Sequence, residues 1–139
     1  MIILDTNVLS ALMRRPADLT VAAWLDRQSR QSIWTSSITI LEIRFGLAIM
    51  GDGRRRDALV EAFERLIDDK LEQRIAGFDQ AAAEAAAGLM VKRKIRGEPG
   101  DLRDTMIAGI VLARRAVLAT GNVKHFADAG MEIVNPWDA

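Results

Sequence analysis

At the start of the chain, a short apolar run changes abruptly into polar residues. Met1 to Leu4 are too few to cross a membrane and too apolar for a solvated arm, so they predict a short buried strand. Asp5 then lies at the carboxyl end of that strand. Thr6 and Asn7 favour a helix start, and the apolar spacing of the following "VLSALM" predicts that a helix continues there.

In the next segments, apolar residues recur every three or four positions, as in amphipathic helices. Residues 18–29 begin with Asp18 as a candidate N-cap, and residues 54–73 form a second amphipathic pattern. Between them, the segment from Ser37 to about Gly51 is apolar nearly all round, which predicts a buried helix. The apolar faces expected for the two amphipathic helices are Leu19, Ala22, Ala23 and Leu25 in the first, and Leu59, Phe63, Leu66 and Ile67 in the second.

The remaining pattern alternates between strands and helices. Short β-prone runs occur at residues 32–36, 74–78, 116–120 and 131–137. Helices are expected at residues 79–97, closed by Gly97, and within residues 98–116 after a Pro-Gly turn, whereas residues 121–130 predict a loop or a single helical turn. This alternation indicates one α/β domain over residues 1–139, with a largely parallel sheet covered on both faces.

Composition narrows the function classes. The chain contains no cysteine, so thiol catalysis, disulfides and cysteine metal sites are excluded, and a metal would need oxygen ligands with at most one histidine, His125. No apolar stretch approaches the length of a membrane span, and we expect a soluble cytoplasmic protein with no membrane partner. The net charge is zero, from 19 basic and 19 acidic side chains, so nucleic-acid binding would depend on local basic clusters. Such clusters are present at Arg14 and Arg15, residues 54–56, residues 92–96, and Arg114 and Arg115; each fits either a solvated helix end or a phosphate contact.

Two acids occupy positions that suggest a function. Asp5 lies where α/β proteins bind ligands, and Glu42 lies where burial makes an ionised side chain energetically costly. Asp5 ends the first strand, and ligand sites gather at the carboxyl ends of parallel strands, although an N-cap role also explains this residue. Glu42 shares a helical stripe with Ile38, Phe45 and Ile49, where burial of its charge would cost several kcal/mol without a partner. A basic side chain or a metal would each meet that need, and Arg44 points to a different helical face.

Further polar candidates occur in the last third of the chain. Asp101 is a candidate N-cap, and Asp104 follows in the first helical turn, directly before a strongly apolar segment. Thr120 and Asn122 lie just past a predicted strand, where a simple turn also accounts for Asn122. The lone His125 fits an ordinary surface or structural role, because one histidine makes neither a triad nor a zinc site.

Taken together, Asp5, Glu42, Asp104 and Asn122 are expected to converge at one edge of the sheet. Oxygen ligands of this kind suit a hard cation such as Mg²⁺ or Mn²⁺. Such a cation can activate water and stabilise the charge that develops on a phosphodiester.

Five stretches of this sequence, "MIILDTNVLS", "SITILEIRFGL", "DTMIAGIVLA", "LATGNVKHF" and "IVNPW", resemble the PIN domains of VapC-type toxins from type II toxin-antitoxin systems, particularly the FitB-like branch. The resemblance runs over essentially the whole chain. It implies a PIN-like three-layer α/β/α fold with a central, mostly parallel sheet of four or five short strands. It also implies ribonuclease activity, a homodimer, and a cognate antitoxin that blocks the site and directs the complex to operator DNA.

The family's acidic positions fall on Asp5, Glu42 and Asp104, with Thr6 and Thr120 in supporting hydroxyl positions. The fourth acidic position falls on Asn122, where many relatives have aspartate; this departure removes a negative charge and bears on whether a second metal binds. Asp101 could compensate, because it lies one helical turn from Asp104.

The leading hypothesis is a metal-dependent endoribonuclease that is the toxin of a toxin-antitoxin pair. Asp5 and Asp104 would hold Mg²⁺ or Mn²⁺, Glu42 would ligate directly or through water, and Asn122 would orient a water or a phosphate oxygen. A metal-activated water would attack the RNA phosphodiester, and by resemblance the cut would leave a 5'-phosphate.

Two alternatives belong to other classes. A phosphatase with Asp5 as nucleophile commonly needs a second acid two residues later, where this chain has Asn7. A weakly catalytic or non-catalytic module that binds RNA or antitoxin would fit the missing fourth acid at Asn122.

Overall fold

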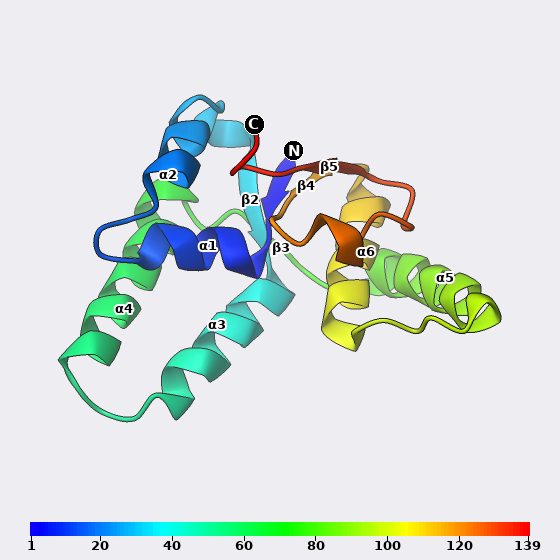
Figure 1. The fold of residues 1–139 in the computed structure, drawn as a ribbon, viewed down its shortest axis with the longest axis horizontal. Helices are drawn as coiled ribbons and strands as arrows, with labels where there is room; N and C mark the ends of the chain where they lie inside the picture. Colours follow the sequence, from blue (N-terminus) through cyan, green and yellow to red (C-terminus); the bar gives the residue numbers. More distant parts are fainter.

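A parallel sheet forms the centre of the protein. The computed structural model describes residues 1–139. Its five strands pair in the order β3-β2-β1-β4-β5, and every pairing is parallel (Figure 1). The sheet confirms the predicted fold class, and the strands are short: β1 Ile2–Leu4, β2 Ile33–Ser36, β3 Ile75–Ala76, β4 Val117–Ala119 and β5 Glu132–Val134.

Six α-helices connect the strands, and three short helical turns complete the chain. The α-helices are α1 Thr6–Met13, α2 Leu19–Asp26, α3 Ser37–Ile49, α4 Arg54–Arg65, α5 Gln80–Arg96 and α6 Leu102–Arg114. The turns are η1 Arg30–Ser32, η2 Leu66–Lys70 and η3 Val123–His125. Gly97 ends α5 with φ 73°, a left-handed conformation that glycine adopts without strain.

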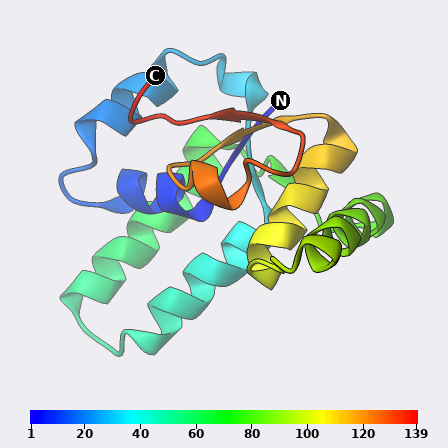
Figure 2. The ribbon, with the colours of Figure 1, turned by 45° about the vertical axis from the view of Figure 1, so that its right-hand side comes forward.

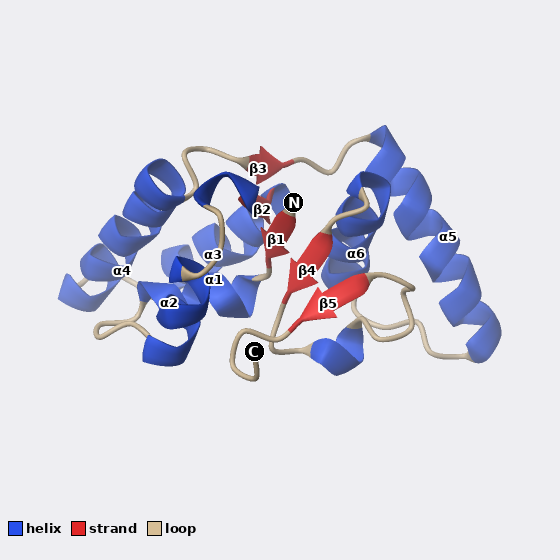
Figure 3. Ribbon diagram, turned by 90° about the horizontal axis from the view of Figure 1, so that it is seen from above, coloured by secondary structure: helices blue, strands red, loops and turns tan.

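The helices form a layer on each side of the sheet. Figure 3 shows α1, α2 and α4 on one side of the strands and α5 and α6 on the other. Neighbouring residues of β1 point to opposite faces, so Leu4 joins the core under the first group and Ile3 the core under the second. Helix α3 reaches both cores, through Ile43 and Ile38 respectively. This arrangement is the predicted three-layer α/β/α fold.

Helices α5 and α6 approach each other closely because small residues line their contact. A Cβ atom added to Gly109 of α6 would lie 2.4 Å from the carbonyl oxygen of Ala82 and 2.8 Å from the Cβ of Ala86. The alanine-rich sequence of α5 and Gly109 of α6 therefore let the two helices pack at short range.

Two predicted helix faces are wrong in part. Helix α2 buries Val21 and Trp24, whereas Leu19 is 82% exposed. Helix α3 is not buried all round, because Phe45 and Ile49 are exposed. Figures 1 and 2 show the reason: α3 extends away from the short strands toward the α3–α4 turn, so its second half has core on one side only. No helix combines the length and the apolar character needed to span a membrane.

Candidate active site

The strand order reverses its direction of growth between β1 and β4, and such switch points are where ligands bind in open α/β sheets. Asp5 lies at this point, immediately after β1, and its side chain is 3% exposed. Its Oδ1 accepts the backbone N–H of Thr6 over 2.8 Å, so Asp5 is also the N-cap of α1. The two explanations considered for this acid, a cap and a ligand-site residue, are therefore compatible.

The other oxygen of Asp5 is held by side chains from two elements. Oδ2 accepts the Thr120 hydroxyl over 2.7 Å and the Asn7 side-chain N–H over 3.0 Å. Burial raises the pKa of Asp5, and the negative charges of Asp104 and Glu42 raise it further, while the Thr120 and Thr6 hydrogen bonds oppose these effects. The fold thus holds a carboxylate at the switch point in surroundings that disfavour its charge.

Asn7 joins the ends of β1 and β4. Its side-chain N–H lies 3.2 Å from Thr120 Oγ1, and its Oδ1 accepts the backbone N–H of Gly121 over 2.9 Å. Asn7 was not among the predicted site residues. Its position two residues after Asp5, the acid at the end of the strand, is the one sequence feature that could have identified it as a site residue.

Glu42 enters the site from α3, and its side chain is 20% exposed. The Thr6 hydroxyl donates to Oε1 over 2.7 Å, and Arg103 Nε of α6 lies 3.7 Å from Oε2. The sequence predicts either a basic side chain or a metal beside Glu42, and Arg103 is such a basic side chain. Arg44 instead faces Glu64 at 3.8 Å, which agrees with its prediction for a different helical face.

Asp104 lies in the first turn of α6, and its own backbone amide is capped by the side chain of Asp101. The backbone N–H of Asp104 donates to Asp101 Oδ1 over 3.1 Å, so Asp101 is an exposed N-cap. Partial burial raises the pKa of Asp104, and the Asp101 charge adds to this rise. His125 Nδ1 lies 3.1 Å from Asp104 Oδ2.

The η3 turn places the remaining candidates on the surface. His125 is 57% exposed in its side chain, so it is a surface residue that also contacts Asp104. Asn122 is exposed; its backbone N–H donates to Thr120 Oγ1 over 3.0 Å, and its side-chain amide has no protein partner. The amide is therefore free to meet a water or a ligand oxygen.

The three carboxylates influence one another, but they do not form a compact ligand set in this structure. Asp104 and Glu42 both act on the pKa of Asp5, whereas no group of three acidic or histidine side chains lies close enough to hold a metal ion. Glu42 is instead engaged by Thr6, and Asp104 by His125. The chemistry of the donors, all carboxylate oxygens, fits a hard cation such as Mg²⁺ or Mn²⁺, which would relieve their mutual repulsion.

Known proteins share both this sequence and this fold. Residues 2–130 match the PIN domain family model. The chain is 38% identical over 138 residues to the VapC ribonuclease Y4jK of Sinorhizobium fredii, covering 99% of each chain. It is 32% identical over 137 residues to the toxin FitB of Neisseria gonorrhoeae, again covering 99% of each. The solved structure of FitAB bound to an IR36 DNA fragment has a TM-score of 0.87 and 32% identity, over 99% of this chain and 96% of that one.

The match extends over nearly all of the chain, includes β1 with Asp5 as well as the η3 turn, and agrees with the independent likeness in fold. The residues that line the switch point between β1 and β4 therefore belong to a known architecture. This chain is a member of the PIN domain family, similar to the VapC and FitB toxins.

Proposed function

We propose that the protein is a metal-dependent endoribonuclease and the toxin of a type II toxin-antitoxin system. One observation carries the proposal: a buried carboxylate, Asp5, lies at the switch point of the sheet with a raised pKa, and the charges of Glu42 and Asp104 contribute to that rise. Repelling carboxylates at a ligand-binding position are the expected arrangement for a site whose function requires a cation. The names of the VapC and FitB relatives support a ribonuclease and a toxin.

In this proposal Asp5, Glu42 and Asp104 hold Mg²⁺ or Mn²⁺. When bound, such a cation lowers the pKa of a water and neutralises charge on a phosphodiester. The chain's own residues orient the acids: Thr120 and Asn7 fix Asp5, and Thr6 fixes Glu42. The free amide of Asn122 orients a water or a phosphate oxygen.

The proposal includes partners. A cognate antitoxin would cover the site and bring the complex to operator DNA, in keeping with the FitAB complex on DNA. A homodimer would cover the exposed apolar side of α3, where Leu41, Phe45 and Ile49 recur at every fourth position. We place the protein, as a single domain, in the cytoplasm.

The decisive experiment is cleavage of labelled RNA by purified, antitoxin-free protein with Mg²⁺, Mn²⁺ or EDTA. Wild type is expected to cut only with a metal, and both Asp5→Asn and Asp104→Asn to lose cutting. Asp57→Asn is the matched control, because Asp57 is an exposed acid of α4 outside the site. Calorimetry with Mn²⁺ adds a readout independent of turnover, and binding should weaken in the two site variants alone.

Cutting in EDTA would contradict the metal requirement. No cutting by a folded wild type on diverse RNAs would favour the alternative of a non-catalytic binding module. In that case Asn122→Asp, which restores the fourth acid, is the next variant.

A further inference from the structure

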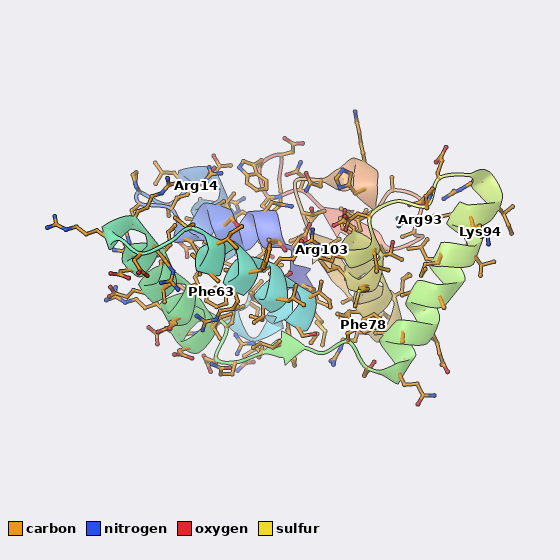
Figure 4. All side chains as sticks on the ribbon, turned by 90° about the horizontal axis from the view of Figure 1, so that it is seen from below. Arg14, Phe63, Phe78, Arg93, Lys94 and Arg103 are labelled. Carbon is orange, nitrogen blue, oxygen red and sulfur yellow. The ribbon has the colours of Figure 1, made fainter.

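A groove of about 280 Å³ lies between α1, α3 and α4 and includes Glu42 of the site in its lining. Thr6 and Glu42 form part of its lining next to the site, and Arg14 and Arg55 line it as well. Arg14 follows the last residue of α1, and Arg55 lies in the first turn of α4. Figure 4 shows Arg14 toward one end of the molecule and Arg103 nearer its centre.

Both groove arginines are without an ionic partner, unlike Arg56 at the start of the same helix α4. Arg56, next to Arg55, donates to the Leu47 carbonyl over 3.0 Å and lies 3.3 Å from Asp52. Arg14 and Arg55 form no salt bridge and no hydrogen bond. The charge of Arg14 contributes to lowering the pKa of Asp18, but no salt bridge joins the two. The carboxylate oxygens of Asp18 already accept backbone N–H groups of α2 and the indole N–H of Trp137.

On the opposite side of the site, unpaired acidic side chains outnumber basic ones, in contrast to the groove with Arg14 and Arg55. A second cavity, of about 410 Å³, lies around the start of α6 and the η3 turn. Its arginine, Arg93, is 3% exposed and is engaged by Asp128, which leaves Lys124 as the only unpaired Lys or Arg of the lining. Four acids line this cavity: Glu98, Asp101, Asp104 and Asp128.

From these observations we propose that Arg14 and Arg55 bind backbone phosphates of single-stranded RNA and direct the strand through the α1–α3–α4 groove to the acids. The inference rests on the proposed ribonuclease function and assigns the path of its substrate. A protein of zero net charge does not attract RNA as a whole, so cations near the acids must offset the repulsion of a polyanion. Arginine suits this task, because its planar guanidinium meets two phosphate oxygens at once.

Two double variants test the path at constant charge. Arg14→Ala/Arg55→Ala removes both groove cations, and Arg15→Ala/Arg54→Ala removes their exposed sequence neighbours, which do not line the groove. Anisotropy of a labelled oligouridylate in EDTA, between about 50 and 200 mM KCl, measures binding without cleavage. Each single-strand phosphate contact contributes about 0.7 to the slope of log K against log salt. The groove variant should therefore bind about 25-fold more weakly at 0.1 M salt, with a slope shallower by about 1.4.

Cleavage kinetics give a second readout. The groove variant should raise KM and keep kcat, since a backbone contact away from the reacting atoms binds ground state and transition state equally. The control variant should match wild type within about twofold in both assays.

Equal losses in the two double variants would show a general charge effect and overturn the groove. Wild-type RNA binding in both would also overturn it. A wild type that neither binds nor cuts RNA would instead refute the proposed function, and the groove path with it.

Discussion

Thr120 at the end of β4 donates its hydroxyl to Asp5 Oδ2 at the end of β1 over 2.7 Å, and both side chains are buried. The bond favours the ionised form of an acid whose pKa burial raises. Thr120→Val removes it, so the pKa of Asp5 rises further and metal binding, which requires the ionised carboxylate, weakens. We expect a 10- to 100-fold rise in the Mn²⁺ concentration for half-maximal cleavage, about the range for such supporting groups.

Thr120→Ser separates this effect from simple loss of fold. Serine keeps the hydroxyl that also accepts the N–H groups of Asn7 and Asn122, so it should retain the wild-type metal dependence. An unchanged Mn²⁺ requirement in Thr120→Val would show that the hydroxyl does not tune Asp5.

Asp104→Asn should separate activity from stability. Partial burial and the Asp101 charge raise the pKa of Asp104, so the folded protein disfavours its ionised form. A raised carboxyl pKa means that stability falls as pH rises through the folded pKa, and the neutral amide removes this loss at pH 7. The metal-free variant should therefore unfold at the wild-type temperature or up to about 4 °C above it, while cleavage is lost. A lower Tm in EDTA, measured beside Asp57→Asn, would contradict this.

Arg93 and Asp128 form a two-pronged pair that holds the η3 region against α5. Arg93 Nε and Nη2 lie 3.0 Å from the two carboxylate oxygens, and Nη1 donates to Thr105 over 2.7 Å (Arg93 is labelled in Figure 4). Asp128→Asn leaves a buried guanidinium without its anion, and we expect a loss of about 3 kcal/mol in unfolding free energy. Asp52→Asn, which breaks the exposed pair with Arg56, should cost less than about 1 kcal/mol.

The same pair predicts a pH dependence. Hydrogen bonds from Arg93 and Arg96 lower the pKa of Asp128 to about 2. A lowered carboxyl pKa gives stability that is present above the unfolded value of about 4 and is lost as pH falls toward 2. Urea unfolding should therefore show a large difference between wild type and Asp128→Asn at pH 7 that shrinks across this acid range. A constant difference would mean that packing, not charge, causes the loss.

The predictable part of the fold is the part set by local pattern. Short apolar runs that end in polar residues mark the parallel strands, and N-caps such as Asp5 and Asp18 mark helix starts. The buried face of a helix depends on its neighbours, which a single sequence does not show. Leu19 and Phe45 both fit an apolar pattern, yet the chain leaves them exposed because the helices meet core on one side only.

The same distinction applies to the site. Asp5 and Thr120 were predictable together, because the carboxyl ends of parallel strands meet at one sheet edge. The contact of Arg103 with Glu42 depends on where α6 lies relative to α3, and that of His125 with Asp104 on where η3 lies relative to α6. No spacing along the chain encodes those distances, so these neighbours emerge only from the fold.

The exposed side of α3 predicts how two copies associate. Leu41, Phe45 and Ile49 are 53%, 58% and 69% exposed, and their spacing of four residues places them on one stripe of the helix. Pairing this stripe with a second copy would remove it from water. A carboxylate in the middle of such a contact is buried without a partner on both subunits, so Phe45→Glu should weaken the dimer by about 3 kcal/mol, or about 100-fold in Kd. Light scattering across a dilution series should give a wild-type mass of twice 15.3 kDa and a monomer for the variant. Leu19→Glu, at an 82% exposed position of α2, is the control and should stay dimeric. A monomeric wild type, or a Phe45→Glu variant as dimeric as Leu19→Glu, would exclude this face as the dimer contact.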